Sequence, residues 1–344
     1  MKVSIIGTTG YSGGELFRLL HHHPVFHIQS VHTTREEIPL SEEFPHLNGI
    51  SNLHLEHIDP YEIAKHSDVV FIAAPSGVSS KLVPLFAQTD IQIIDLSGDL
   101  RLTDREMYRK WYKNEPVEDN LLEKAVYGLS EWNKEKIKGA RLIANPGCYP
   151  TATLLGLAPV VKAGLIDPNM IIVDAKSGAS GAGRSVAKNL LFAEINENFR
   201  IYKVNEHQHI PEIEQQLQIW NQEITPISFN THLLPITRGI MATTYVKLTN
   251  QISTDQLIEL YKEQYVNDPF VRIRNSGNFP SVKEVSGSNY CDIGMHVDER
   301  TGRVTIVSVI DNLMKGAAGQ AVQNANLMNG IDEKTGLEFI PLYP

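Results

Sequence analysis

Short apolar runs alternate with stretches of helical periodicity through the first third of the chain. An order of strand, helix and strand predicts a parallel sheet with helices on both faces. The expected strands lie at 2–6, 27–33, 68–73, 91–95 and 140–144, and the expected helices at 13–22, 60–66, 76–88 and 130–138.

The pattern changes after residue 148, where longer runs rich in β-branched residues alternate with amphipathic stretches. The expected strands here are 170–176, 227–236, 239–248, 290–298 and 303–311, and the expected helices are 185–198, 211–222 and 254–266. We therefore predict an α/β fold, with a doubly wound parallel sheet at 1–147 and an α+β mixed-sheet domain at 148–312. A final helix at 313–330 is expected to pack back on the first domain.

The composition limits which partners the protein can bind and in which compartment it is expected. The 344 residues, 42% hydrophobic and 21% charged, are typical of a globular protein of about two domains. A net charge of −9 argues against nucleic acid or an anionic membrane as partner. The apolar runs are far shorter than the roughly 20 residues that span a bilayer. Two cysteines make no disulfide framework in a chain this long, so we expect a reducing cytoplasm.

Cys148 stands between a strand-like run that ends in Asn145-Pro-Gly and a helix-forming run that begins near Pro150. A thiol in the first turn of a helix lies against unpaired N–H groups and the positive end of the helix dipole, which favour the nucleophilic thiolate. The same N–H groups can stabilise an oxyanion on a carbonyl attacked there. A buried, inert cysteine is the alternative, because most unpaired cysteines are small core residues.

A glycine-rich turn follows the first strand and opens the first helix, with glycines three residues apart. Glycines at this junction let a pyrophosphate approach the backbone and lie on the helix N-terminus, as in Rossmann-type dinucleotide sites. A βα turn without a ligand is the alternative, because the spacing is not the commoner G-x-G-x-x-G. The residues of the turn that we assign to the cofactor are Gly7, Thr9, Gly10, Tyr11, Ser12 and Gly13.

The end of the second strand indicates which dinucleotide binds. NAD enzymes usually carry an acidic residue there for the ribose 2′-OH, whereas this strand ends in Thr33-Thr34-Arg35. Hydroxyls and an arginine fit a 2′-phosphate, so we predict NADP(H), with a solvated loop arginine as the alternative for Arg35. Pro75 and Ser76 follow the strand at 68–73 on the same edge of the sheet, where a dinucleotide crosses it.

Two histidines and a glutamate lie close together in the sequence, at His207, His209 and Glu212. A histidine paired with a reactive thiol serves as acid and base. A metal site is one alternative, although no third ligand with matching spacing is evident, and a purely structural role is another.

Two further loops end in arginine after a strand. The segment Ser177-Gly-Ala-Ser-Gly-Ala-Gly-Arg184 offers backbone N–H groups to an anion or to the cofactor. The segment Ser97-Gly-Asp-Leu-Arg101 offers a guanidinium for a bidentate grip on phosphate or carboxylate, with a surface ion pair as the alternative.

A thiolate together with a nicotinamide site suggests one type of reaction. The thiolate attacks an activated acyl group and expels its leaving group. The resulting thioester accepts a hydride, and the thiohemiacetal collapses to an aldehyde while histidine handles the protons.

Six segments resemble the N-acetyl-γ-glutamyl-phosphate reductases of arginine biosynthesis, and the resemblance covers essentially the whole chain. The most specific are Asn145-Pro-Gly-Cys-Tyr-Pro-Thr151 and His207-Gln-His-Ile-Pro-Glu-Ile213. The others are Gly7–Leu16, Ser97–Arg101, Ser177–Arg184 and Lys315–Asn324. One departure is Ala73-Ala-Pro-Ser-Gly77, where many members carry Leu-Pro-His-Gly, and it leaves the contacts of this loop open.

The resemblance implies that NADPH reduces N-acetyl-L-glutamyl 5-phosphate, a small-molecule substrate, to N-acetyl-L-glutamate 5-semialdehyde through a thioester on Cys148. It implies His207 as the acid and base, His209 and Glu212 as supporting residues, and Asn312 near the nicotinamide. It also implies a homo-oligomer, a dimer or a tetramer, with 148–312 as the catalytic and oligomerisation domain. We assign the remaining site residues to the cofactor (Ser177 and Gly178) and to the substrate (Arg101, Asn145, Ser180 and Arg184).

Three other activities compete with this one. A related reductase of aspartyl or aminoadipyl phosphate would share the fold and the chemistry and differ only in its pocket. A non-catalytic NADP-binding sensor would use the glycine turn alone, and the cysteine and histidine segments weigh against it. A short-chain reductase needs a Tyr-x-x-x-Lys pair, which occurs only at Tyr61 and Lys65, too early in the chain to face a nicotinamide.

Overall fold

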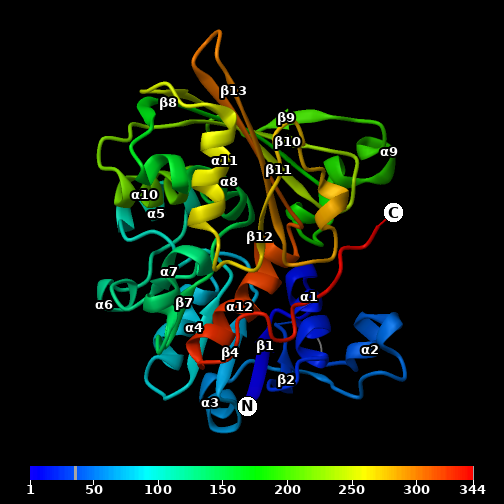
Figure 1. The fold of residues 1–344 in the computed structure, drawn as a ribbon. Coiled ribbons are helices and arrows are strands. Elements are labelled where there is room, and N and C mark those ends of the chain that lie inside the picture. Colours follow the sequence, from blue (N-terminus) through cyan, green and yellow to red (C-terminus); the bar gives the residue numbers. More distant parts are fainter. Residues whose placement is uncertain (35–36, 344) are drawn as a thin grey trace. The chain divides into compact units, whose positions relative to one another are not determined.

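The computed structural model describes residues 1–34 and 37–343 and consists of two compact units. Unit 1 comprises Met1–Pro146 and Ala317–Glu338, and unit 2 comprises Gly147–Gly316 and Phe339–Pro344. Figure 1 labels the helices and most of the strands. The chain leaves unit 1 immediately before Gly147, so Cys148 is among the first residues of unit 2.

The sheet of unit 1 has seven parallel strands in the order β3-β2-β1-β4-β5-β7-β6. The strand order reverses between β1 and β4, and ligands of doubly wound sheets bind at the carboxyl edge of such a switch point. The bounds are β1 Lys2–Ile6, β2 His27–His32, β3 Leu55–Glu56, β4 Val69–Ile72, β5 Gln92–Asp95, β6 Val126–Tyr127 and β7 Leu142–Ala144.

Helices cover both faces of this sheet. All four residues of β4 are buried, as a strand between two helical layers requires. Val70 and Ile72 pack with Ile63 of α3 and Val83 of α4, and the alternation of side chains along a strand turns Val69 and Phe71 to the opposite face. There α12 packs against α1 and α7. The bounds are α1 Tyr11–His21, α2 Leu40–Glu43, α3 Pro60–His66, α4 Ser79–Phe86, α5 Arg105–Tyr112, α6 Asp119–Leu122, α7 Ser130–Ile137 and α12 Gly319–Met328.

Unit 2 is built on a mixed sheet in the order β12-β13-β14-β11-β8-β10-β9. Buried and half-buried residues alternate along β11, and α8 packs against β8, β11, β13 and β14, so one face of the sheet is covered by α8 with α10 and α11. The strands are β8 Ile166–Ser177, β9 Arg200–Tyr202, β10 Ser228–Leu233, β11 Ile240–Leu248, β12 Val271–Ile273, β13 Cys291–Asp298 and β14 Arg303–Ile310. The helices are α8 Cys148–Lys162, α9 Phe192–Ile195, α10 Ile210–Trp220 and α11 Thr254–Gln264.

The predicted fold class is confirmed in both units. The predicted helix at 185–198 is wrong, because that stretch holds only a 3-10 turn at Lys188–Leu190 and the four residues of α9. Several of its apolar side chains are exposed, Val186 to 94%, and none is fully buried, so no packed face stabilises a longer helix. The short edge strands β3, β6, β9 and β12 had no distinct pattern in the sequence.

Candidate active site

Cys148 is the first residue of α8, and Gly147 before it has the extended backbone of an N-cap residue. The expected helix start is therefore confirmed. The first turn of α8 contains no acidic side chain of its own, and the positive end of the helix dipole acts on the half-buried thiol. This environment favours the thiolate.

Glu212 connects α10 to the loop that carries the thiol. Its carboxylate is fully buried in the first turn of α10, and Oε1 accepts the backbone N–H of Gly147 at 2.8 Å. The bond ends one residue before Cys148. Glu212 thus stabilises the backbone turn that presents the thiol.

His207 and His209 lie together just before α10, with ring centroids 4.7 Å apart and side chains about nine-tenths buried. Burial, with a smaller contribution from the charge of Lys203, lowers the pKa of His207 to about 3. His207 is therefore neutral near pH 7. Its Nδ1 accepts the backbone N–H of His209 at 3.2 Å, which leaves the ring proton on Nε2.

A pair of tyrosines, which sequence reasoning missed, completes this cluster. The hydroxyls of Tyr149 and Tyr202 are 3.0 Å apart, and the ring of Tyr149 packs edge-on against His207 at 5.2 Å. Burial raises the pKa of both tyrosines, and the nearby charge of Cys148 adds to the rise. Both therefore remain neutral hydroxyls. Tyr149 adjoins Cys148 in the sequence, but Tyr202 reaches the cluster only through the fold.

The Ser177–Arg184 loop is held by Asn312 in the same unit. Asn312 donates from Nδ2 to Ser180 Oγ at 2.9 Å and accepts the N–H of Gly239 at 2.8 Å. Gly178 passes so close to the backbone that a Cβ there would lie 2.8 Å from the carbonyl oxygen of Thr237. The structure thus brings Ser177, Gly178, Ser180 and Asn312 together, whereas Arg184 is exposed.

In unit 1, the glycine turn lies at the end of β1 and at the switch point of the sheet. Gly7 has φ +83°, and a Cβ there would collide with the carbonyl oxygen of Ala73. A Cβ on Gly13 would collide with the carbonyl oxygen of Gly7. Gly10 is the N-cap residue of α1, and no acidic side chain occupies the first turn. The turn therefore fits a pyrophosphate on the helix N-terminus.

The other residues predicted to bind the cofactor in unit 1 differ in their exposure. Tyr11 is exposed, Thr9 and Ser12 are half-buried, and Thr34 is exposed at the end of β2. Arg35 lies outside the described residues.

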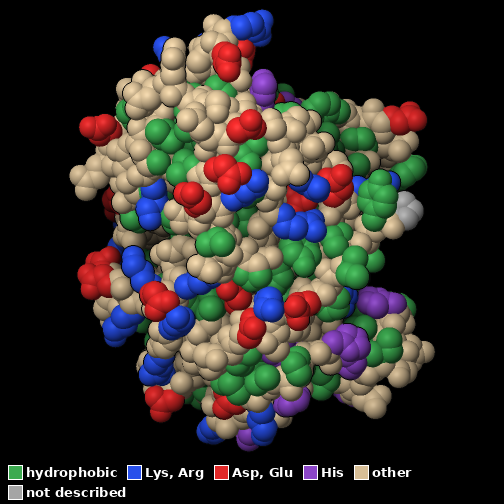
Figure 2. All heavy atoms as spheres, in the orientation of Figure 1, with side chains coloured by type: hydrophobic (Ala, Val, Ile, Leu, Met, Phe, Trp, Pro, Cys, Tyr) green, Lys and Arg blue, Asp and Glu red, His purple; other side chains and the backbone are tan. Residues whose placement is uncertain are grey.

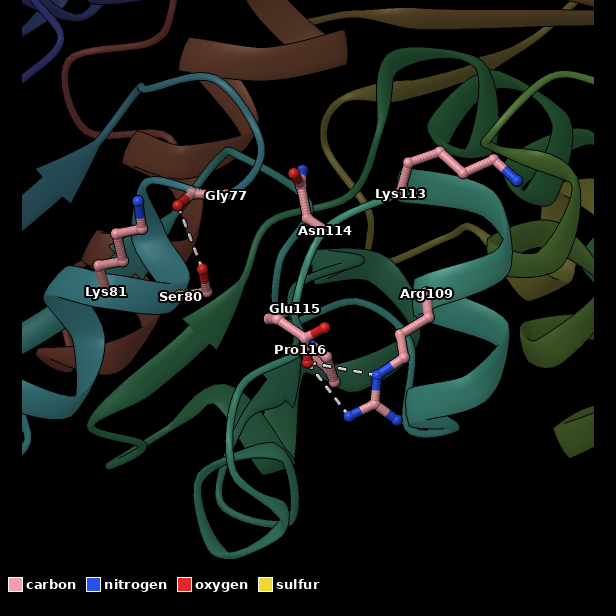
Figure 3. Close-up of a pocket in the computed structure, with 8 residues that line it drawn as sticks. All are labelled: Gly77, Ser80, Lys81, Arg109, Lys113, Asn114, Glu115 and Pro116. Atoms are coloured by element: carbon pink, nitrogen blue, oxygen red, sulfur yellow. Dashed lines mark hydrogen bonds and ion pairs between the residues drawn. The ribbon is translucent and has the colours of Figure 1, made fainter.

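Asp99 organises the loop after β4 that includes Pro75 and Ser76. Its buried carboxylate accepts the N–H groups of Gly77 and Ser80 at 2.8–2.9 Å and the hydroxyl of Tyr108 at 2.7 Å. A pocket of about 650 Å³ lies beside this loop, and Figure 3 shows the side chains that line it. The residues that line it are Gly77, Ser80, Lys81, Arg109, Lys113, Asn114, Glu115 and Pro116. A ligand in this pocket would therefore meet charged side chains among apolar surface.

Arg101 and Asn145 contact each other at the carboxyl edge of the unit 1 sheet. The guanidinium of Arg101 is buried and donates to the carbonyl oxygens of Asn145 at 2.7 Å and Leu96 at 2.8 Å. The surface ion pair considered as an alternative does not describe this buried side chain. Asn145 also accepts an N–H from Asn324 on α12 at 3.0 Å. Their substrate-binding role stays a prediction.

Within residues 1–34 and 37–343, no three His, Cys, Asp or Glu side chains come together as a metal site would need. None of the helices in the same ranges combines the length and the apolarity needed to cross a membrane.

The chain matches two family models. The one described as "Semialdehyde dehydrogenase, NAD binding domain" covers residues 2–140, and the one described as "Semialdehyde dehydrogenase, dimerisation domain" covers residues 148–312. Residues 2–140 thus form a dinucleotide-binding domain.

Solved structures show the same fold at low identity. Aspartate semialdehyde dehydrogenase II from Vibrio cholerae, complexed with ASA, matches with a TM-score of 0.70 at 18% identity, over 95% of this chain and 97% of that one. Aspartate semialdehyde dehydrogenase from Candida albicans, solved with NADP, matches with a TM-score of 0.70 at 14% identity over the same shares.

Curated relatives are much closer in sequence. N-acetyl-gamma-glutamyl-phosphate reductases from Geobacillus stearothermophilus and Geobacillus sp. (strain WCH70) are 58% and 57% identical, and the one from Bacillus cereus (strain AH187) is 53% identical. Each alignment covers 100% of both chains. With both family models matched in order, the chain belongs to the N-acetyl-gamma-glutamyl-phosphate reductase family of the semialdehyde dehydrogenases.

Proposed function

We propose that this chain reduces N-acetyl-L-glutamyl 5-phosphate to N-acetyl-L-glutamate 5-semialdehyde and phosphate, with NADPH, in arginine biosynthesis. As a member of its family, the chain is an oxidoreductase. The observation that carries the proposal is the thiol of Cys148 at the start of α8, whose neighbour Tyr149 packs against the neutral, buried His207. Names of full-length relatives support the choice of substrate.

Cys148 supplies the nucleophile. Its thiolate forms a bond to the acyl carbon while the bond from that carbon to the phosphate oxygen breaks, and phosphate leaves with the electron pair. N–H groups of the first turn of α8 stabilise the oxyanion of the tetrahedral intermediate. When bound, the dinucleotide supplies the hydride that converts the thioester into a thiohemiacetal.

His207 handles the proton of the later steps. The neutral ring takes the proton of the Cys148 thiol as the thiolate forms, and the imidazolium then donates that proton to the oxygen that becomes negative as the thioester is reduced. The thiohemiacetal returns the proton to His207 as it collapses to the aldehyde and the Cys148 thiolate. Burial keeps His207 neutral, so the ring enters the cycle without a proton to lose first. His209 and Glu212 support this geometry through the His207 ring and the Gly147 backbone.

Arg35 sets the preference for NADPH in this proposal. No carboxylate stands in Thr33-Thr34-Arg35, and the neighbouring glycine turn fits a pyrophosphate. Arg35→Ala is expected to weaken NADPH binding by about 1.5–3 kcal/mol, the value of one charged contact, and to change NADH binding much less. Equal losses for the two cofactors in a titration of binding would show that Arg35 does not recognise the 2′-phosphate.

We propose further that unit 1 is the cofactor domain and that unit 2 is the catalytic and oligomerisation domain of a cytoplasmic homo-oligomer. The match of residues 148–312 to a dimerisation domain supports the second assignment. In unit 2, Ser177, Gly178 and Asn312 are proposed to contact the cofactor, and Ser180 and Arg184 the substrate.

The decisive experiment measures kcat/KM in the phosphorylating direction, with NADP and inorganic phosphate, for N-acetylglutamate semialdehyde and aspartate semialdehyde. A site that forms hydrogen bonds to the acetamide leaves its own polar groups unsatisfied when the acetamide is missing, at about 1–3 kcal/mol each. The kcat/KM of N-acetylglutamate semialdehyde is therefore expected to be at least about tenfold higher than that of aspartate semialdehyde. A ratio of the two kcat/KM values near one would contradict the assignment of N-acetylglutamate semialdehyde as the substrate, and it would leave the thioester mechanism unaffected. Absence of turnover with either, or with an aminoadipyl analogue, would favour a cofactor-binding sensor.

A further inference from the structure

We propose that residues 186–204 of unit 2 form a surface on which a second copy of this chain docks, and that this contact holds Tyr202 against Tyr149 beside the thiol. The inference rests on the homo-oligomer proposed above and specifies its surface. We call residues 186–204 the docking segment.

The docking segment exposes an unusual number of large apolar side chains. Figure 2 shows hydrophobic side chains gathered beside α9. Of the 16 large hydrophobic residues that are exposed in the described chain, six lie in this stretch. They are Val186 (94%), Leu191 (51%), Phe192 (78%), Phe199 (58%), Ile201 (49%) and Val204 (47%). Concentrated exposure of this kind marks an interaction surface.

The segment has little structure of its own to explain this exposure. Its regular elements are a 3-10 turn, the four residues of α9 and the three of β9. β9 pairs with β10 and ends the order of the sheet, so its other edge presents backbone groups for pairing. An isolated helix of four residues is not stable by itself. External contacts would stabilise both elements.

Backbone strain points in the same direction. Four non-glycine residues among the described ones have positive φ. Two of them, Glu197 and Lys203, lie in the docking segment, and a third, Asn205, directly follows it. Such conformations persist where the surroundings hold them. Here much of the surroundings is solvent in the single chain.

A second copy is the occupant that fits best. The dimerisation-domain match, residues 148–312, contains the whole segment. The segment also carries both signs of charge, with Lys188 and Arg200 beside Glu194 and Glu197 in sequence. A two-fold contact places the same patch on both subunits, so a patch of mixed sign can complement itself.

The segment is directly connected to the catalytic cluster. Tyr202 of β9 meets the hydroxyl of Tyr149 at 3.0 Å, and its carbonyl oxygen accepts the hydroxyl of Thr231 at 2.6 Å. Tyr149 packs against His207 and adjoins Cys148. Burying Phe199 and Ile201, which flank Tyr202 in the chain, would fix β9 and with it the tyrosine pair.

The test compares the assembly of the full chain with that of Phe192→Glu and Phe199→Glu. Val266→Glu is the matched control, because Val266 is 74% exposed in the same unit and lies outside the docking segment. In sedimentation velocity we expect the wild type and the control to share one oligomeric mass, and the two phenylalanine variants to fall to half of it or less. Wild-type mass in both variants, or a monomeric wild type at all concentrations, would overturn the proposal.

A second readout tests the connection to the catalytic cluster. The dissociated variants are expected to lose at least tenfold in kcat and to change the rate of Cys148 alkylation by iodoacetamide at least threefold. Dissociation with both rates unchanged would overturn this part. If a glutamate variant does not fold, two measurements replace it: the Phe192→Ser variant, and dilution of the wild type. In both, the oligomeric mass and the alkylation rate are followed together, and they test the same two parts of the proposal. A wild type without semialdehyde turnover would reject the proposed function, while mass and alkylation would still decide on the surface.

Discussion

At the scale of the residue, the two cysteines show how position changes the chemistry of one side chain. Cys148 is half-buried at a helix start, whereas Cys291 is fully buried in β13 with its sulfur 3.3 Å from the hydroxyl of Ser308. Only the first lies at the positive end of a helix dipole and is reachable from solvent.

Cys148→Ser is therefore expected to remove nearly all turnover and to leave NADPH binding close to that of the wild type. A hydroxyl at the same helix start is a far weaker nucleophile. Iodoacetamide, followed by mass spectrometry of peptides, should label Cys148 well before Cys291 in the native protein. Labelling in the opposite order, or substantial activity of the serine variant, would contradict the assignment.

His207 provides the second prediction, because its pKa is about 3 in the native state and 6.5 as an ordinary value. Between these pH values the unfolded chain binds a proton that the native chain does not, so stability falls as the pH falls. At pH 5 the titration of this single residue is expected to lower the free energy of unfolding by on the order of 2 kcal/mol. Thermal unfolding should show the difference between wild type and His207→Asn shrinking or changing sign from pH 7 to pH 5.

The same substitution is expected to lower kcat by roughly 10²–10⁴, and His209→Asn by less. Parallel pH profiles of unfolding for wild type and His207→Asn would mean that the ring titrates normally. A larger loss of kcat from the His209 variant would reverse the two roles.

At the scale of the element, α10 acts on the thiol through one hydrogen bond from the Gly147 backbone to Glu212. Glu212→Ala leaves that buried N–H unsatisfied, which is expected to cost about 1–3 kcal/mol in unfolding and to lower kcat. Glu212→Gln keeps an acceptor oxygen and should recover most of both.

Glu214 on the same helix is the matched control, because its Oε1 accepts the backbone N–H of Ile227 at 2.9 Å, away from the thiol loop. Glu214→Ala should lower the melting temperature and spare kcat. If both alanine variants lose kcat equally, the loss comes from destabilising α10 as a whole and not from the hydrogen bond between Glu212 and Gly147.

The βα turn of unit 1 allows a similar separation of stability from binding. A Cβ on Gly10 would find its nearest neighbour at 3.5 Å, an ordinary contact, whereas a Cβ on Gly13 would collide with the Gly7 backbone. Gly10→Ala is expected to keep the melting temperature and to weaken NADPH binding by about tenfold or more, because the pyrophosphate needs close backbone approach. Gly13→Ala should destabilise the protein. Unchanged binding in calorimetry by a folded Gly10→Ala would reject the pyrophosphate site.

At the scale of the whole molecule, unit 1 is completed by α12, a helix that comes after most of unit 2 in the sequence. All ten residues of α12 are buried, and Asn324 on this helix bonds to the carbonyl oxygen of Gly128 at 2.8 Å and to Ser130 and Asn145. Residues 317–338 are thus part of unit 1 although nearly 170 residues of unit 2 come before them.

A chain that ends at Gly316 is therefore expected to lose folded unit 1. Removing α12 exposes apolar surface and leaves buried polar groups without partners, each at a cost of about 1–3 kcal/mol. The summed cost exceeds the free energy of unfolding of a domain, which is about 5–15 kcal/mol. Limited proteolysis should degrade residues 1–146 rapidly, and NADPH binding should be absent. A chain that ends at Glu338 is the control and should bind normally. Normal binding by the shorter chain would show that α12 is dispensable.

The local patterns predicted much of this molecule. The strand, glycine turn and helix at residues 2–21 and the helix start at Cys148 could be inferred because turn glycines and apolar periodicity act over a few residues. The stretch 185–198 was misjudged for a related reason. Its composition allows a helix, but no neighbouring surface buries the apolar side chains in the single chain.

The sequence by itself determined the order of most of the longer elements, the class of each domain, the thiol at a helix start and, through its motifs, the family. The tertiary structure alone decided which distant residues meet: Tyr202 with Tyr149, Glu212 with Gly147, and Arg101 with the backbone of Asn145. It also decided that His207 is neutral. The physical reason is that secondary structure and dipoles follow from neighbours along the chain, whereas burial, and the hydrogen bonds and pKa values that depend on it, come from segments far apart in sequence.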